Sequence, residues 1–134
     1  MRSVVLVAGI MMLPMTGLAA AAGLEGLVAR GNYLVHDVAM CVQCHTPRHA
    51  NGELDRTRLL KGAPVPVPSP FPTQPWAFTA PAIAGLPGFS DEDEITLLTT
   101  GRRLGSAAPK PPMPPFRLTR EDAEAVVAYL RSLP

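Results

Sequence analysis

Apolar residues recur at spacings of three and four in three segments of the chain, and each segment predicts a helix with one apolar face. The first segment spans residues 24–38 and runs directly toward Cys41. Its apolar positions are Leu24, Leu27, Val28, Gly31, Leu34, Val35 and Val38. We therefore expect a long helix immediately before the cysteines.

The other two predicted helices begin at recognisable caps. Ser90 opens SDEDEITLLTTG with Asp93 at the capping-box position, and Gly101 stands where the helix should end. Thr119 opens TREDAEAVVAYLRSLP with Asp122 at the box position. The apolar face of this last helix consists of Ala123, Val126, Val127, Leu130 and Leu133.

The 16 prolines of the chain are concentrated in two stretches, residues 64–75 and 109–115. Each proline removes a backbone donor and restricts φ, so neither stretch can be a helix interior or a central strand. No element is predicted with certainty between Ala50 and Pro87. The pattern indicates an all-α domain with three main helices and long proline-rich loops.

The N-terminal 22 residues have the pattern of a secretory signal peptide. Arg2 precedes an apolar run, and small residues near Ala20 and Ala22 offer cleavage positions. An uncleaved membrane anchor is the alternative, but Pro14 and Gly17 interrupt the run. We expect a signal peptide at 1–22, a single domain at 23–134, and export to the periplasm, where the protein is soluble or peripherally associated with the membrane.

The expected mature domain has no net charge. Of the 12 basic residues, Arg2 falls in the signal peptide, which leaves 11 against 11 acidic residues. A neutral chain of this kind lacks the basic surface that nucleic-acid binding requires.

The two cysteines of the chain lie in CVQCH, as Cys41 and Cys44, with His45 directly after them. A zinc site needs four ligands, and no second cysteine pair is present. A thioredoxin-type dithiol expects a preceding strand, whereas the preceding segment here is predicted to be helical. A disulfide across two residues would close only a very small loop and stabilise little.

The remaining reading of this motif uses all three residues. Cys-x-x-Cys-His is the attachment motif of c-type haem, in which the thiols of Cys41 and Cys44 bond the porphyrin vinyl groups and His45 binds the iron. We therefore predict one covalently attached haem c.

The chain then resembles a class I cytochrome c. TAPAIAGL, residues 79–86, resembles the segment after the haem motif in that family, and AVVAYLRSL resembles the C-terminal helix. The segments RGNYLVHDVAMCVQCHTPR and PPMPPFRLTREDAEAVVAYLRSLP resemble the small cytochrome domains that serve bacterial periplasmic or membrane-bound dehydrogenases.

The resemblance implies the cytochrome c fold and specific contacts within it. Pro81 would accept a hydrogen bond from His45 Nδ1–H, and Ile83 would contact the haem. Gly31 would allow the terminal helices to approach closely, with Tyr129 in their contact.

The sixth iron ligand decides between electron transfer and ligand binding. Met113 lies in PKPPMPPF, where the distal loop of the family lies, and flanking prolines restrict its backbone. Met40 abuts Cys41 and is expected to fill the core, so Met113 is the predicted ligand. His36 and His49 are the bis-histidine alternatives.

These observations predict a His/Met-ligated one-electron carrier that is not an enzyme and transforms no small-molecule substrate. It would pass electrons between a dehydrogenase and the respiratory chain. An open sixth position (a peroxidase-like protein or gas sensor) and a haem-free dithiol module are the alternatives. The expected partner is a redox protein: a dehydrogenase, of which this chain could be the haem subunit, a terminal oxidase or another cytochrome. A basic run (Arg102, Arg103, Lys110, Arg117 and Arg120) is a candidate docking surface for an acidic partner.

Overall fold

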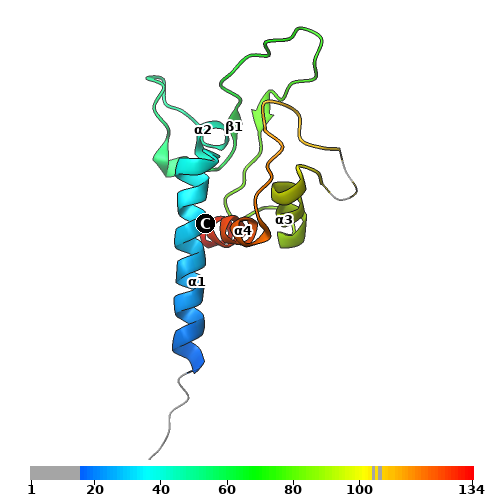
Figure 1. Ribbon diagram of the computed structural model, residues 1–134. Coiled ribbons are helices and arrows are strands. Elements are labelled where there is room, and N and C mark those ends of the chain that lie inside the picture. The colour runs from blue at the N-terminus through cyan, green and yellow to red at the C-terminus, as the bar shows by residue number, and fades with distance from the viewer. Residues whose placement is uncertain (1–15, 104, 106) are drawn as a thin grey trace, which may run out of the picture.

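A computed structural model describes the backbone of residues 16–103, 105 and 107–134. The described chain is mainly helical (Figure 1), as predicted, with very little sheet. Its main helices are α1 (Thr16–Tyr33), α3 (Asp91–Thr100) and α4 (Arg120–Ser132). Shorter elements are a π-helix (Leu34–Val38), α2 (Val42–His45), a 3₁₀ turn (Arg56–Arg58), β1 (Ala63–Pro64) and β2 (Thr79–Ala80).

The first predicted helix ends differently from a regular α-helix. The α-helical part stops at Tyr33, and residues Leu34–Val38 continue as one π-helical turn. Met40 then takes a positive φ of 52°, which turns the chain into α2. Apolar periodicity alone does not reveal this change, because the π-helical turn also buries apolar residues, Leu34 and Val35.

Helices α1 and α4 cross at close range and form the centre of the core (Figure 1). Gly31 lies at the crossing, and a Cβ there would overlap the Ala125 carbonyl and the Tyr129 side chain. The role expected for Gly31 is thus confirmed. Tyr129 is buried in the same contact and is hydrogen-bonded to His36 Nε2 at 2.8 Å.

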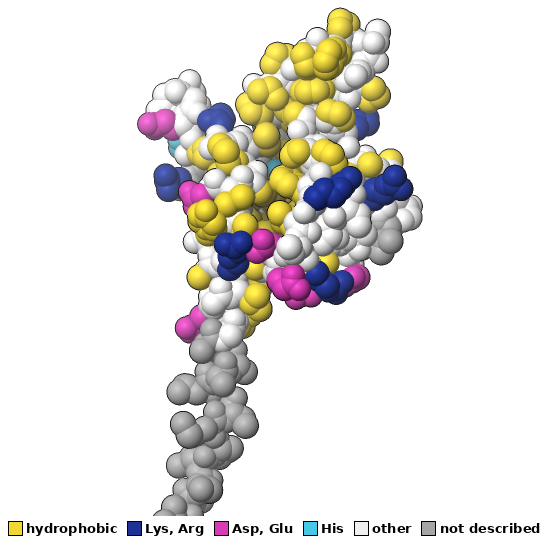
Figure 2. Space-filling view, in the orientation of Figure 1, with side chains coloured by type: hydrophobic (Ala, Val, Ile, Leu, Met, Phe, Trp, Pro, Cys, Tyr) yellow, Lys and Arg dark blue, Asp and Glu magenta, His cyan; other side chains and the backbone are white. Residues whose placement is uncertain are grey.

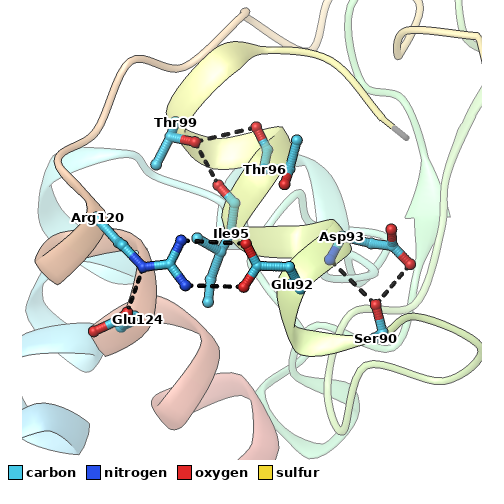
Figure 3. Close-up of polar contacts among 8 residues, drawn as sticks. All are labelled: Ser90, Glu92, Asp93, Ile95, Thr96, Thr99, Arg120 and Glu124. Carbon is cyan, nitrogen blue, oxygen red and sulfur yellow. Dashed lines mark hydrogen bonds and ion pairs between the residues drawn. The ribbon is translucent and has the colours of Figure 1, made fainter. Parts of the chain in front are cut away.

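Caps fix the ends of α3 and α4, and an ion pair joins the two helices. Ser90 accepts a hydrogen bond from Asp93 N, as the capping pattern predicted, and Gly101 ends the helix with a φ of 71°. Arg120 at the start of α4 binds both Glu92 and Glu124 (Figure 3). Thr119 caps α4 by accepting from Asp122 N.

The proline-rich stretch after α2 forms a long hairpin, where sequence analysis predicted no element with certainty. Strands β1 and β2 pair antiparallel, with Ala63 opposite Ala80, and residues 65–78 form the connecting loop. Gly62 N donates to His45 O at 2.8 Å, which joins the base of the hairpin to α2. Each strand has only two residues, too few for a period-two pattern to be visible in the sequence.

Residues 1–15 of the predicted signal peptide lie outside the described residues, and its cleavage stays a prediction. Among the helices that the structure describes, none has both the length and the apolar character needed to span a membrane.

The α1–α4 crossing can be tested with Gly31→Ala. The added methyl group would have to displace the α4 backbone at Ala125, and such overpacking costs about 1–3 kcal/mol. Denaturant unfolding of the haem-loaded protein should show this loss of stability.

The matched control is Gly26→Ala in the same helix, where a Cβ would meet nothing within 4 Å. It should leave stability unchanged or raise it by up to about 1 kcal/mol, because alanine favours helix more than glycine does. Equal effects of the two substitutions would contradict the close crossing.

Candidate functional site

The three residues of the CxxCH motif share one short helical turn. The turn begins at Cys41 and continues through α2, which ends at His45. The two cysteine side chains are half-buried, and His45 is 7% exposed. One turn of helix separates the thiols and places the imidazole beside them, so three functional groups face the same space.

A hydrogen bond fixes the ring of His45. Its Nδ1 lies 2.8 Å from the carbonyl oxygen of Pro81, 36 residues later in the chain. A carbonyl can only accept, so Nδ1–H is the donor, and Nε2 is left as the nitrogen with a free lone pair. Burial lowers the pKa of His45, against the opposing effect of the Pro81 contact, which keeps the ring neutral and able to bind a metal.

The loop that carries Met113 is held at both of its ends. Ala77 N donates to Pro111 O at 2.8 Å, and Leu118 N donates to Leu98 O at 3.1 Å. A Cβ at Gly101 would overlap Pro115, so the end of the loop packs tightly on the end of α3. Met113 itself is half-buried.

Cys41, Cys44, His45 and Met113 all line one cavity of about 480 Å³. The structure therefore brings together every site residue predicted from the sequence. Figure 2 shows the molecule hollowed beneath its uppermost lobe, with a histidine side chain visible inside the hollow. The rest of the wall is mostly apolar and includes Val65, Ala77, Phe89, Leu98, Pro112 and Phe116.

The Cys41 thiol does not have the electrostatics of a nucleophilic cysteine. Burial raises the pKa of Cys41 to about 11. Nucleophilic cysteines need the opposite shift, toward a stable thiolate at neutral pH. In the described part of the chain, no group of three or more His, Cys, Asp or Glu side chains could hold a metal ion, so the zinc reading finds no ligand set there.

The alternative histidine ligands lie elsewhere. His36 is hydrogen-bonded to Tyr129 in the helix crossing, and exposed His49 lies 3.9 Å from Asp55. Neither is among the residues that line the cavity.

Met40 does not fill the core, contrary to the expectation for it. It is 51% exposed and lines the cavity from the CxxCH side, because its positive φ turns the side chain away from the helix crossing. Ile83 also differs from expectation. Ile83 belongs to the core and does not line the cavity, and Trp76 Nε1 donates to Val67 O at 3.0 Å within its own loop.

One part of the cavity wall was missed by sequence analysis. Arg103 lines the cavity, lies 4.2 Å from the ring centre of Phe89, and binds Glu94 at 3.0 Å. Glu94 is 5% exposed, and burial raises its pKa although Arg103 opposes the shift. The available signal was a carboxylate on the apolar face of α3, since a buried charge of this kind needs a partner.

The predicted basic docking surface is only partly free. Arg103 is paired with buried Glu94, and Arg120 is paired with Glu92 and Glu124. Arg102 and Lys110 are exposed. Within the described residues, neither side chain forms an ion pair or a hydrogen bond, unlike the other three cations of the run. The local positive potential is thus weaker than the charge run suggested.

The residues present fit a covalently attached haem. Two thiols and one neutral imidazole stand on a single turn, and the fixed Nδ1–H leaves Nε2 for iron. The cavity falls within the usual size range of cofactor sites, and its apolar wall suits a porphyrin. Met113 supplies a thioether to the same cavity, the second soft ligand that a His/Met site requires.

Comparison with known proteins agrees with this chemistry. The family model described as Cytochrome c matches residues 28–134. The Fructose dehydrogenase cytochrome subunit of Gluconobacter japonicus is 31% identical over 115 residues, which cover 78% of this chain and 22% of that protein. A Diheme cytochrome c-type of Cereibacter sphaeroides is 30% identical over 111 residues, covering 78% of this chain and 35% of that protein. The chain thus spans only a fifth to a third of the length of these relatives.

Asp55 organises the segment between α2 and β1. It is 5% exposed, and its carboxylate accepts from Thr57 Oγ1 at 2.6 Å and from Arg58 Nε at 2.7 Å. Its backbone N donates to Pro47 O at 2.8 Å. The hydrogen bond from Thr57, followed by that from Arg58, lowers the pKa of Asp55 well below its ordinary value of 3.8.

A carboxyl group whose pKa is lowered by folding stabilises the folded protein at pH values above its ordinary pKa. This stabilisation is lost as the pH falls toward the lowered pKa. Asp55→Asn should therefore lower the melting temperature at neutral pH, and its gap from the wild type should shrink as pH falls below about 3.8. Melting curves over a pH series check this, with the exposed Asp37→Asn as control. A gap that stays constant with pH would contradict the role of the Asp55 carboxylate.

Proposed function

The chain belongs to the cytochrome c family, and on that premise we propose that it is a one-electron carrier with a single haem ligated by His45 and Met113. Its family and its dehydrogenase-subunit relative identify it as an electron-transfer protein and not a catalytic one. The observation that carries the finer proposal is the shared cavity, which both ligand side chains line. The single CxxCH motif supports one haem for this chain.

The protein's own residues set the properties of the proposed site. When bound, the haem supplies one iron that accepts and releases a single electron between Fe(III) and Fe(II). Pro81 orients His45 and favours the neutral ring that donates to iron from Nε2. Met113 would hold the iron as its second protein ligand, and a thioether ligand of this kind raises the reduction potential.

The apolar wall has a second effect on the proposed site. Phe89, Leu98 and Phe116 exclude water from the cavity, and exclusion of water favours the form with less net charge. The reduced iron is that form, so burial and methionine ligation act in the same direction on the potential.

A dehydrogenase and the respiratory chain are the proposed donor and acceptor. The relative from Gluconobacter japonicus is by its name the cytochrome subunit of a fructose dehydrogenase. Because this chain matches about a fifth of that protein, a fructose substrate does not carry over. We place the protein in the periplasm on the basis of the predicted signal peptide at 1–22.

Met113→Ala tests the ligand assignment and the alternative of an open sixth position. The substitution should lower the reduction potential and allow carbon monoxide to bind the reduced protein, while the covalent haem remains. Met40→Ala is the matched control, because Met40 lines the same cavity but is not a proposed ligand. It should change neither property.

Redox titration and carbon monoxide difference spectra measure both effects. A Met113→Ala protein with the wild-type potential and no carbon monoxide binding would show that another residue is the ligand. A wild-type protein that binds carbon monoxide readily would instead support an open sixth position.

Attachment of the haem should be required for stable folding. A cavity of about 480 Å³ lies beside the core of a domain of little more than a hundred residues, and an unfilled apolar cavity destabilises its surroundings. Cys41→Ser/Cys44→Ser protein, which cannot attach haem, should therefore lose the cooperative thermal transition seen by circular dichroism. A cooperative melt with full helical content in that haem-free variant would contradict this expectation.

A further inference from the structure

The loop between β1 and β2, residues 65–78, exposes an apolar surface that the site does not use. Three of its large side chains are exposed: Val67 by 46%, Phe71 by 54% and Phe78 by 86%. We call these three residues the loop patch. Figure 2 shows hydrophobic side chains gathered over the uppermost lobe, where Figure 1 places this loop.

No charged residue occurs between Lys61 and Asp91, although much of this segment is exposed. Elsewhere the described surface carries many ion pairs, including those of Arg30, Arg58 and Arg131. An exposed apolar surface without charges is unfavourable in water unless something covers it. The composition of the loop therefore indicates a contact that is apolar and not electrostatic.

The loop patch is held in a defined shape. Val65 N donates to Phe78 O at 2.9 Å, and Trp76 Nε1 donates to Val67 O at 3.0 Å. Ser69 Oγ accepts from Phe71 N at 3.1 Å, and six prolines between residues 64 and 75 restrict the backbone further. A surface ordered in advance loses little conformational entropy when a partner covers it.

The patch also encloses a hollow that could accept a side chain. Its volume is about 710 Å³, and Val67, Phe71, Trp76 and Phe78 contribute to its lining. Apolar pockets of this kind receive the aromatic or aliphatic anchor residues that dominate the energy of protein interfaces.

The hollow adjoins the haem cavity. Val65, Ala77 and Lys110 line both spaces, and Ala77 is hydrogen-bonded to Pro111 in the loop that carries Met113. A protein bound on the loop patch would therefore lie directly beside the haem cavity. This continuity distinguishes the patch from exposed Tyr33 and Val38, which line neither space.

We propose that the loop patch is the docking surface for an uncharged, apolar surface of the protein with which this cytochrome exchanges electrons. The proposal rests on the electron-transfer function proposed above. A lipid surface is disfavoured, because membrane-binding surfaces commonly place several cations among their apolar residues and only Lys110 lines this hollow. The Trp76 indole N–H, which would favour a polar membrane interface, is already bound to Val67.

Photocrosslinking in the cells that make the protein tests where the partner binds. p-Benzoylphenylalanine is placed at position 78 in the full chain, and at position 33 as the control. The proposal expects position 78, and not position 33, to crosslink to a protein that carries a flavin, haem or other redox cofactor. A redox partner captured from position 33 alone, lipid adducts alone, or a second copy of this chain at position 78 would overturn it.

Kinetics with that crosslinked partner, once purified, tests the energetic role. Phe71→Ser/Phe78→Ser should slow electron exchange roughly tenfold or more, at low and at high salt alike. Tyr33→Ser/Val38→Ser, at two side chains that are each 51% exposed and line neither space, should leave the rate unchanged. A rate unaffected by the loop substitutions, or one that falls steeply with salt in the wild type, would overturn apolar docking.

Two further measurements separate a failure of the docking proposal from a failure of the proposed function. The reduction potential and the visible spectrum of Phe71→Ser/Phe78→Ser should match the wild type, which shows that the fold and the haem site are intact. If the wild type itself lacks the His/Met potential, the proposed function fails, whereas normal spectra with unaltered kinetics reject only the docking surface. If the wild type binds vesicles of mixed zwitterionic and anionic phospholipid and the loop substitutions abolish that binding, the loop patch is a membrane-binding surface instead.

Discussion

The hydrogen bond between His45 Nδ1 and the Pro81 carbonyl joins α2 to the segment after β2, and much of the remaining structure serves to maintain it. The base of the hairpin is bound to α2 through Gly62 N and His45 O, and the β1–β2 pairing then positions Thr79 and Ala80 directly before Pro81. Pro81 follows directly after Ala80, the last paired residue of β2, and its carbonyl accepts from the imidazole. The paired strands therefore hold the acceptor of His45 beside α2, although the loop 65–78 separates the strands in the chain.

A second constraint acts from the core side. The close crossing of α1 and α4 at Gly31 fixes where α1 ends, and the π-helical turn with the positive φ of Met40 then redirects the chain into α2. On the other side, α3 packs against α4, and the end of α3 supports the loop that carries Met113 at Gly101 and Leu98. Helix packing thus positions both walls of the cavity, while the loops supply most of the side chains that line it.

Local signals explain why so much of this arrangement was predictable. Ser90 and Thr119 cap helices through short-range hydrogen bonds, and CVQCH encodes its chemistry in five consecutive residues, so both can be recognised in one sequence. The Arg103–Glu94 pair, the orientation of Met40 and the folding of loop 65–78 depend on contacts between distant segments or on single backbone dihedrals. Apolar periodicity carries no information about these features. The exposed phenylalanines show the same limit, because a proline-rich composition predicts stiffness but not which side chains face water.

We propose that His45 and Met113 bind the same iron within this cavity. Proton NMR of the reduced protein tests it directly, because a methionine bound to haem iron lies over the porphyrin ring and its methyl signal moves far upfield. We expect one such methyl resonance, assigned to Met113 through selective labelling, with the Met40 methyl near its ordinary position. An ordinary shift for Met113, or a ring-shifted signal that belongs to Met40, would show that Met113 does not bind the iron.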